Sequence, residues 1–259
     1  MPLPRGYAEL APPPSLAGII TCVWTRTQDV QRDRTVPRIP VLPDACTDLI
    51  WVSGVGAVVA GPDTVANRTD FGQSHTFVGI RFAPGHGGAA FGASLVELRN
   101  SRLSAPDAWS VRSRRARSRD VKMAFDAVHG SESPGDAMAA VLRFASAVAA
   151  DVSTHSLAAH AASRIRHPEV SVRSLAAELE ISDRRLHRMF EANVGYGAKT
   201  VQRIDRFQRF LSELTRSESL ADAAARAGYA DQPHLSRECI ALSGMTPSAL
   251  RAARSGTPA

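Results

Sequence analysis

Apolar positions along the chain change their spacing near residue 85. Before that point, short apolar and β-branched runs are separated by Pro, Gly and Asp, and the stretch TFVGIRF alternates before Pro84. A two-residue period is typical of strands that bury one face. Short strands at this spacing favour a small barrel or sandwich. The pattern predicts strands at Ile19–Thr27, Arg38–Leu42, Leu49–Val52, Ala57–Ala60 and Thr76–Phe82.

After residue 85 the spacing of apolar residues becomes helical. A breaker, Ser133-Pro134-Gly135, separates two of the expected helices, and several more fill Val170–Arg251. We therefore expect an α+β chain, with a strand-rich, barrel-like domain over residues 1–150 and an all-α domain over residues 151–259. The helices expected before residue 170 are Gly87–Phe91, Ser94–Leu98, Val121–Val128, Asp136–Ala150 and Ser153–Ile165.

An internal repeat lies in the C-terminal part of the chain. Its first copy runs from Leu175 to Phe190, and its second runs from Ala223 to Arg237. Each copy predicts a helix, a tight turn and a second helix. Serine and aspartate side chains are good N-caps, because their oxygens accept free backbone N–H groups. Four pairs lie 49 positions apart: Ser182 and Asp231 as N-caps, Leu186 and Leu235, Arg188 and Arg237, and Gly195 and Gly244.

Small and apolar residues also indicate two pairs of packed helices. Ala176 and Ala224 fall where the two helices of a copy would cross, and Gly228 suits positive φ in the second turn. Leu186 and Leu235 are expected to face inward. Between the copies, one apolar stripe predicts a long helix. Its members are Val201, Ile204, Phe207, Leu211 and Leu214.

The second helix of each copy carries long polar side chains of the kind that read base edges in the major groove. A single charged stripe on a helix is usually a solvated face, but two stripes behind equivalent caps favour duplex DNA as the partner. Two such helices held by a long helix are expected to enter successive major grooves, about 34 Å apart. The side chains are Arg184, His187 and Arg188 in the first copy, and Gln232, His234 and Arg237 in the second.

Charge and composition narrow the function classes. The net charge of +6 divides equally between residues 1–150 and 151–259, so bulk charge does not show which half meets a polyanion. The three cysteines form no Cys-x-x-Cys pair, which is typical of a reducing compartment. The N-terminus does not read as a signal peptide, and no apolar stretch is long enough to span a membrane. We expect a cytoplasmic protein without a membrane partner.

The stretch from about Asp151 to Arg251 resembles the DNA-binding domain of the AraC/XylS regulators. The match is strongest from Ala224 onward, where a Gly-aromatic turn leads to an Asp-Gln-x-His helix, a Ser-Arg pair and a closing Gly-x-Thr-Pro. The resemblance implies a sequence-specific transcription regulator, either activator or repressor. Duplex DNA and a second copy of the chain are the implied partners, with RNA polymerase as a further candidate. It implies base contacts by Arg184, His187, Arg188, Gln232, Pro233, His234 and Arg237, with Ser236 nearer the backbone.

Three residues depart from the family pattern. Glu180 stands where the first turn often has Gly, and Cys239 stands where a Phe usually packs. Pro233 replaces a polar residue in the second recognition helix, so it offers only apolar contact, although an early helical position tolerates it.

Arg203, Arg206 and Arg209 on the helix between the copies have two candidate roles, phosphate contact or simple solvation. The arginine run over residues 112–119 is expected to be a solvated linker, with contact to DNA phosphates or to an acidic partner as the alternatives.

Three N-terminal segments resemble a sensor-like domain that often precedes AraC-type modules. In the wider family this domain is often a cupin-like barrel that binds a small molecule and supports dimerisation, which implies a small-molecule effector here. Trp24, Trp51 and Arg81 would bind that effector if they line the barrel interior; otherwise the tryptophans belong to the core and Arg81 caps the rim. The segments are Pro43–Trp51, Gly79–Gly85 and Leu103–Trp109.

Other function classes have less support from the residues. His75 and His86 lack a metal-ligand grouping, and no nucleophilic triad or phosphate loop stands out, so we expect no enzyme activity, metal or cofactor. A thiol-based redox or alkylation sensor using Cys22 or Cys46 is one alternative. A ligand-independent DNA-binding assembly protein is another. The helix expected at Asp136–Ala150 is suited either to dimerisation or to packing inside its own domain.

Overall fold

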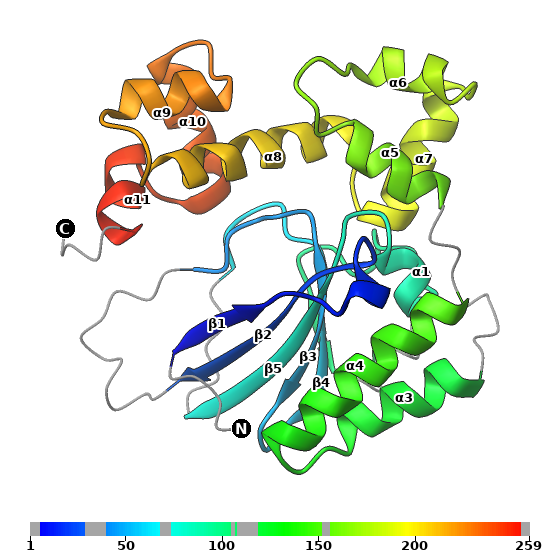
Figure 1. Cartoon of the computed structure of the whole chain (residues 1–259). Coiled ribbons are helices and arrows are strands. Elements are labelled where there is room, and N and C mark those ends of the chain that lie inside the picture. Colours follow the sequence, from blue (N-terminus) through cyan, green and yellow to red (C-terminus); the bar gives the residue numbers. More distant parts are fainter. Residues whose placement is uncertain are drawn as a thin grey trace.

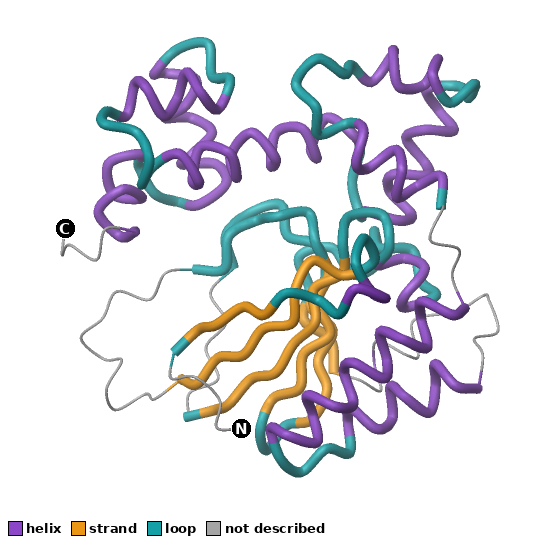
Figure 2. Tube along the Cα trace, viewed as in Figure 1, coloured by secondary structure: helices purple, strands orange, loops and turns teal. Residues whose placement is uncertain are grey.

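The computed structural model describes residues 6–28, 40–67, 74–104, 107, 119–151 and 156–254. Figures 1 and 2 show an antiparallel sheet with two helices against one face and a helical unit across one end. The strands are β1 (Tyr7–Leu10), β2 (Ile20–Gln28), β3 (Thr47–Val52), β4 (Gly56–Ala60), β5 (His75–Phe82) and β6 (Arg102–Ser104). The N-terminal helices are the 3-10 turn Pro14–Leu16, α1 (Gly87–Phe91), α3 (Arg119–His129) and α4 (Pro134–Asp151). The C-terminal helices are α5 (Leu157–Arg164), α6 (Val172–Glu178), α7 (Asp183–Val194), α8 (Ala198–Glu213), α9 (Leu220–Ala227), α10 (Gln232–Ser243) and α11 (Pro247–Arg254).

The sheet confirms four of the predicted strands, which are β2 to β5. Its order is β1-β2-β5-β3-β4-β6, with every neighbouring pair antiparallel. The edge strands β1 and β6 are short and were not predicted. Within the predicted strand Arg38–Leu42, Val41 forms an isolated bridge with Asn67, and residues 38 and 39 lie outside the described part of the chain.

The two faces of the sheet carry different hydrophobic clusters. Side chains alternate along each strand, so Val23, Leu49 and Val78 face a core shared with α3 and α4. Phe82 and Phe144 anchor this core, with ring centroids 6.1 Å apart. Residues of the opposite parity line the other face, and they form a smaller cluster of Cys22, Trp24, Val52, Val58 and Phe77.

The sheet does not close into the expected barrel. In the described part of the chain, β1 and β6 remain separate edges at opposite ends of the strand order. Because α4 packs on β5 and β3, and α3 packs on β4, the apolar face is buried without closure. The α+β class is confirmed, and the N-terminal domain is an open, helix-backed sheet.

Most helix predictions hold to within a few residues. Helix α1 has the expected bounds, whereas Ser94–Leu98 is wrong as a helix because residues 95–100 form turns. Helix α4 buries Ala140, Val141 and Phe144 against the sheet, so its apolar face serves its own domain. Of the arginine run, Arg119 begins α3, and the rest lies outside the described residues. No helix in the described ranges is long and apolar enough to cross a membrane.

The C-terminal unit is organised around α8. The predicted stripe is buried in one core that also takes side chains from α6, α7, α9 and α10. Phe210 joins the stripe because it lies one helical turn before Leu214. A long central helix with a helical pair at each end is therefore confirmed.

Candidate nucleic-acid interface and sheet pocket

Each repeat copy folds as a helix-turn-helix unit. We define unit one as residues 171–195, with α6 and α7, and unit two as residues 219–244, with α9 and α10. The Ser182 side chain accepts a hydrogen bond from the Arg185 N–H (3.2 Å), and Asp231 accepts one from the His234 N–H (2.6 Å). Both predicted N-caps are therefore present, and each fixes where a second helix begins.

The turns of the two units differ by one residue. The Ile181 N–H donates to the Ala176 carbonyl, and the Tyr229 N–H donates to the Ala224 carbonyl, each at 3.0 Å. Equivalent residues of the two first helices are therefore 48 positions apart in the sequence. The second helices are related by 49, so the second turn has one extra residue. Both turns require a left-handed residue after the first helix, and this residue is Glu180 (φ 52°) in unit one and Gly228 (φ 87°) in unit two.

The predicted DNA-contacting side chains of unit one share one exposed face. Arg184, His187 and Arg188 are exposed, whereas Leu186 and Phe190 are buried beneath them. The His187 Nε2 atom lies 3.5 Å from a Glu191 carboxylate oxygen, so a protonated His187 would form an ion pair within its own helix.

Unit two presents a less basic face. Gln232, Pro233 and Arg237 are exposed, and Pro233 lies in the first turn of α10, where a missing N–H costs nothing. His234 and Ser236 are half-buried. The His234 ring packs edge-on against Tyr229 at a centroid distance of 5.3 Å, which also fixes the start of the helix against the turn.

The arginines of α8 contact protein groups, so simple solvation does not describe them, and their contact with phosphates stays a prediction. Arg203 bonds Glu238 of α10 (2.7 Å), Arg209 bonds Asp205 (2.8 Å), and the Arg206 guanidinium lies 5.7 Å from the Tyr229 ring centroid. The Arg203 and Arg206 contacts attach unit two to α8, whereas the Arg209–Asp205 pair lies within α8 itself. By contrast, Arg184, Arg188 and Arg237 have no ion-pair or hydrogen-bond partner within the described residues.

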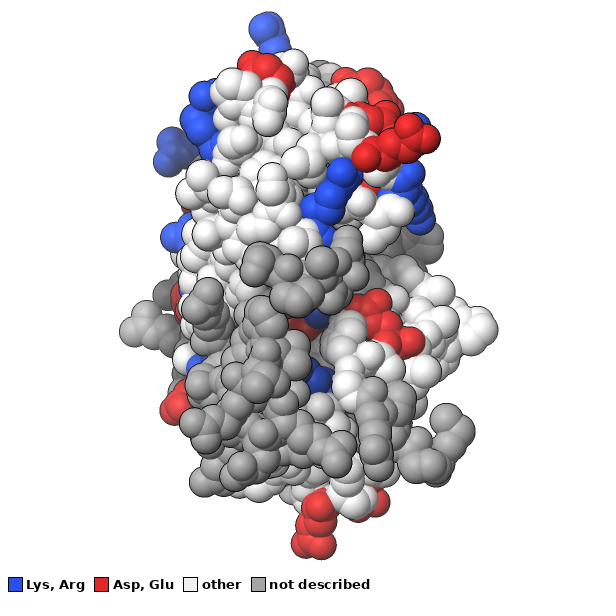
Figure 3. Space-filling view, turned by 90° about the vertical axis from the view of Figure 1, so that its left-hand side faces the viewer, with Lys and Arg blue, Asp and Glu red and all other residues white. Residues whose placement is uncertain are grey.

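Surface charge is uneven over the helical part of the molecule. Figure 3 shows Lys and Arg side chains on both sides of that part, with Asp and Glu side chains gathered mainly toward one edge. The edge away from the acidic side chains is the one that suits a polyanion.

Comparison with known families assigns both parts of the chain. A model described as a helix-turn-helix domain matches residues 175–253, which hold both units. A model described as a domain of unknown function (DUF6597) matches residues 8–104, which hold the sheet. The chain has the architecture of an AraC/XylS regulator. It is a DNA-binding transcription regulator. A search of curated proteins found no match to the chain.

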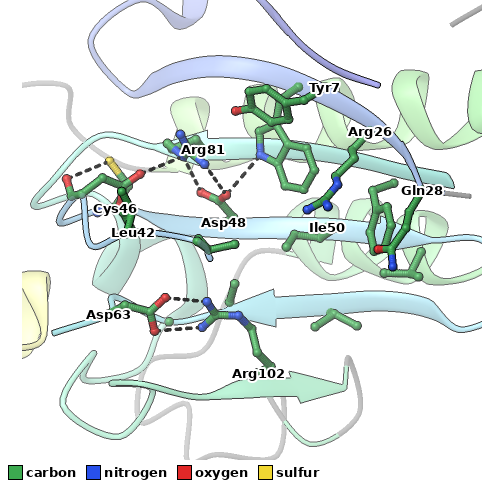
Figure 4. A pocket seen from close by; sticks show the side chains of 18 residues that line it. Tyr7, Arg26, Gln28, Leu42, Cys46, Asp48, Ile50, Asp63, Arg81 and Arg102 are labelled. Atoms are coloured by element: carbon green, nitrogen blue, oxygen red, sulfur yellow. Dashed lines mark hydrogen bonds and ion pairs between the residues drawn. The ribbon is translucent and has the colours of Figure 1, made fainter. Parts of the chain in front are cut away.

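The regulator has a pocket on the face of its sheet opposite α3 and α4 (Figure 4). Its cavity volume is about 120 Å³. The floor is apolar and comes from Trp24, Ile50, Val52, Val58 and Phe77, while charged side chains stand around it. A mostly apolar cavity with a few placed polar groups is the usual form of a small-molecule site.

A cluster of paired charges forms one end of the pocket. Arg81 bonds Asp48 through two nitrogens (3.2 Å each), and its Nε also lies 3.2 Å from Asp44. Trp24 Nε1 donates to the same Asp48 carboxylate (3.1 Å). Burial raises the pKa of Asp48 to about 6, the neighbouring Asp44 adds to the rise, and Arg81 opposes it. The predicted effector residues Trp24 and Arg81 are thus brought together, and Arg81 is already neutralised by protein carboxylates.

Trp51, the third predicted effector residue, does not line the pocket. It is buried in the core on the helix-covered face, and its Nε1 donates to the Ser131 carbonyl (2.9 Å). The strand period explains this, because Asp48, Ile50 and Val52 of β3 face the pocket and Trp51 has the opposite parity.

Several pocket residues were missed from the sequence. Arg102 of β6 pairs with Asp63 and closes one side, and Tyr7 of the unpredicted strand β1 closes another. Arg26 and Gln28 follow Trp24 at steps of two along β2, so parity alone was a usable signal for them.

The thiols and histidines give no sign of chemistry. Burial raises the pKa of Cys22 and, more strongly, that of Cys46, which favours the unreactive thiol over the thiolate. His86 is buried, and burial lowers its pKa. The described ranges contain no group of His, Cys, Asp or Glu that could hold a metal ion.

Two loops connect the pocket to the DNA-binding units. Residues 40–46 supply pocket wall through Leu42 and Cys46, yet Leu42 and Ala45 also pack into the C-terminal core. The Gln208 side chain of α8 donates to the Pro43 carbonyl (2.5 Å). Residues 61–67 also line the pocket, and the Ala66 N–H donates to the carbonyl of Leu242 in α10 (2.7 Å).

Proposed function

We propose that this regulator reads two neighbouring major-groove segments with α7 and α10, and that a small molecule in the sheet pocket controls that reading. One observation carries the DNA part. The arginines of α8 are all engaged by protein groups, whereas Arg184, Arg188 and Arg237 of the recognition helices are exposed without partners in the described chain. A free guanidinium at the start of a helix can bond the O6 and N7 atoms of guanine together.

The proposed base contacts follow the units. In one groove they are made by Arg184, His187 and Arg188, and in the next by Gln232, Pro233, His234 and Arg237. Pro233 has no donor there, so we assign it apolar contact with a thymine methyl group. Ser236 is half-buried and is assigned to the DNA backbone.

The placement of the helices supports this assignment. The carbonyls of Ala192 in α7 and Leu242 in α10 accept hydrogen bonds from the N-terminal half of the chain, so the last turns of both helices are attached there. The proposed contacts occupy the first two turns of each helix, away from those attached ends. Helix α8 has 16 residues and is therefore about 24 Å long, which keeps the units apart.

Selection of binding sites from random duplex DNA with the full chain tests this proposal. We expect two conserved boxes with centres about 10 base pairs apart, and an affinity that falls steeply with salt. Recovery of a single box, or of no sequence preference, would refute reading by two helices.

Effector control is supported by the two loops that line the pocket and contact α8 and α10. We propose residues 1–150 as the sensing and dimerisation domain and residues 151–259 as the DNA-binding domain, neither of them catalytic. A homodimer and contact with RNA polymerase remain predictions from the resemblance. A compound that binds the native pocket must raise the melting temperature of the full chain. If no compound raises it and DNA binding is constitutive, the ligand-independent assembly protein is the correct interpretation.

A further inference from the structure

Among the residues that the structure describes, the charges around the pocket are paired, with one exception. Asp44 and Asp48 share Arg81, and Asp63 is held by Arg102. Arg26 also lines the pocket, and within the described residues its guanidinium has neither an ion pair nor a hydrogen bond. A bound anion would therefore find a free cation in the lining, whereas a bound cation would find carboxylates that arginines already hold.

Arg26 is placed where a free charge is costly. It lies on β2 between Tyr7 of β1 and Phe77 of β5 in the sheet register, and it is half-buried. In Figure 4 its side chain extends toward Ile50 on the apolar floor. An unpaired cation over apolar side chains is destabilising unless a counter-charge arrives.

The floor beside Arg26 is flat and rigid. A side-chain carbon on Gly79 would lie 2.4 Å from the Trp24 indole, so the ring lies directly on the β5 backbone. The hydrogen bond from Trp24 to Asp48 fixes the ring in its plane. Such a surface suits the apolar body of a ligand.

Size and charge restrict the ligand further. The cavity of about 120 Å³ is close to the roughly 150 Å³ that admits benzene, which favours a body of about six to ten non-hydrogen atoms. A single guanidinium matches one carboxylate through two parallel N–H donors. A dianion such as a phosphate monoester would leave its second charge without a counter-charge, because the other described arginines of the lining already hold carboxylates.

We propose that the pocket binds a small organic monocarboxylate, with its carboxylate on Arg26 and its apolar body over Trp24 and Phe77. The Gln28 amide, two residues along the same strand face, is the second donor to the carboxylate. This inference rests on the proposed effector-sensing function and names the chemical class of the effector.

The test uses the full chain with phenylacetate and isovalerate as probes, followed by melting temperature and by calorimetric titration. We expect saturable binding of at least one acid, and at least tenfold weaker binding of its amide. Phenylethylamine and phenyl phosphate should also bind at least tenfold more weakly than the acid. Failure of both acids to bind at millimolar concentration, or equal binding of acid and amide, overturns the proposal.

Variants at Arg26 separate the site from the fold. Arg26→Gln should weaken binding of the acid at least tenfold, and Arg26→Lys should retain part of it, because a charge remains without the paired donors. Without ligand, Arg26→Gln should melt no lower than the wild type, since no ion pair is lost. Arg99→Gln, at an exposed position outside the pocket, is the charge-matched control. Unchanged affinity in Arg26→Gln would overturn the role of Arg26.

A DNA mobility shift with and without the bound acid tests the other proposal separately. Binding of the acid with unaltered DNA affinity would keep the carboxylate site and refute effector control. Loss of the carboxylate site alone would leave DNA reading by α7 and α10 intact.

Discussion

The two helix-turn-helix units share a framework but differ in what they carry and in how they are attached. Unit one presents Arg184, His187 and Arg188, and its recognition helix is docked on the N-terminal domain, where the Leu95 N–H donates to the Ala192 carbonyl (2.9 Å). Unit two presents Arg237 together with Pro233, and its recognition helix is attached through a different segment, because the Leu242 carbonyl accepts from the Ala66 N–H (2.7 Å). The framework therefore depends on few positions, namely the caps, the small residue at the crossing and the left-handed turn residue. The contact surface varies freely on top of them.

The largest effect should come from removing the central arginine of unit one. We expect Arg188→Ala to weaken operator binding by about 1–3 kcal/mol, which is roughly 5- to 150-fold, and to relax one position in one box. Arg237→Ala should relax a position in the other box, with a loss at the lower end of that range. Mobility shifts on single-base operator variants measure both. Lys122→Ala on α3 is the control, and loss of preference in the same box for both arginine variants would contradict the division of labour.

The ion pairs that hold α8 to its surroundings can be broken at two positions in the middle of the helix. Asp205 is buried and accepts from Arg166 (2.7 Å) and Arg209 (2.8 Å), so Asp205→Ala should lower the free energy of unfolding by about 2 kcal/mol. Urea denaturation measures this.

Two residues before Asp205 in α8, Arg203 pairs with Glu238 of α10. Glu238→Ala should cost about 1 kcal/mol or less, because Glu238 is more exposed than Asp205 and loses one arginine partner rather than two. Glu213→Ala should change little, because its ion pair with Arg216 is long (3.9 Å) and the Arg216 side chain is exposed. A larger loss from Glu238→Ala than from Asp205→Ala would reverse the comparison.

Substitution of the left-handed residue should change the free energy of unfolding in opposite directions in the two turns. Gly228→Ala should cost about 1–2 kcal/mol, entirely from backbone strain, because no atom lies within 4 Å of the added carbon. Glu180→Gly should instead stabilise unit one by up to about 1 kcal/mol, since relief of strain exceeds the entropy cost of glycine. Glu180→Ala retains the strain and is the control. A loss of stability in Glu180→Gly, measured by urea denaturation, would show that the Glu180 side chain matters.

The smallest effect concerns pH and the helix that supports unit one. His86 immediately precedes α1, which packs on α7, and burial lowers its pKa. The unfolded chain therefore takes up this proton first as pH falls below about 6.5, and the free energy of unfolding decreases with acid. Asp48 acts oppositely, because its raised pKa stabilises the folded state as pH falls below about 6. The difference in melting temperature between wild type and His86→Gln, measured across pH 5–8, gives the contribution of the histidine to the pH dependence. A difference that stays constant with pH would contradict this account.

The DNA-binding domain could be predicted from the sequence because its signals are local. The pocket has few local signals, so only part of it was predicted. Caps, the buried stripe and the repeat each depend on residues close in the chain, so Ser182, Asp231 and Phe207 have their expected places. The pocket depends on which strands pair and in what register. Trp24 and Trp51 look alike in sequence but face opposite sides, and the ion pair of Arg102 with Asp63 joins segments 39 residues apart.

The loop at residues 40–46 has a consequence for how such regulators can be recombined. Ala45 is part of the hydrophobic core of the C-terminal unit, although it comes from the sheet domain. The boundary between the two domains in sequence is therefore not the boundary between the two cores. A chimera that joins residues 151–259 to a foreign sensor would lack the Ala45 side chain in its C-terminal core. A working exchange therefore has to transfer residues 40–46 together with the helices.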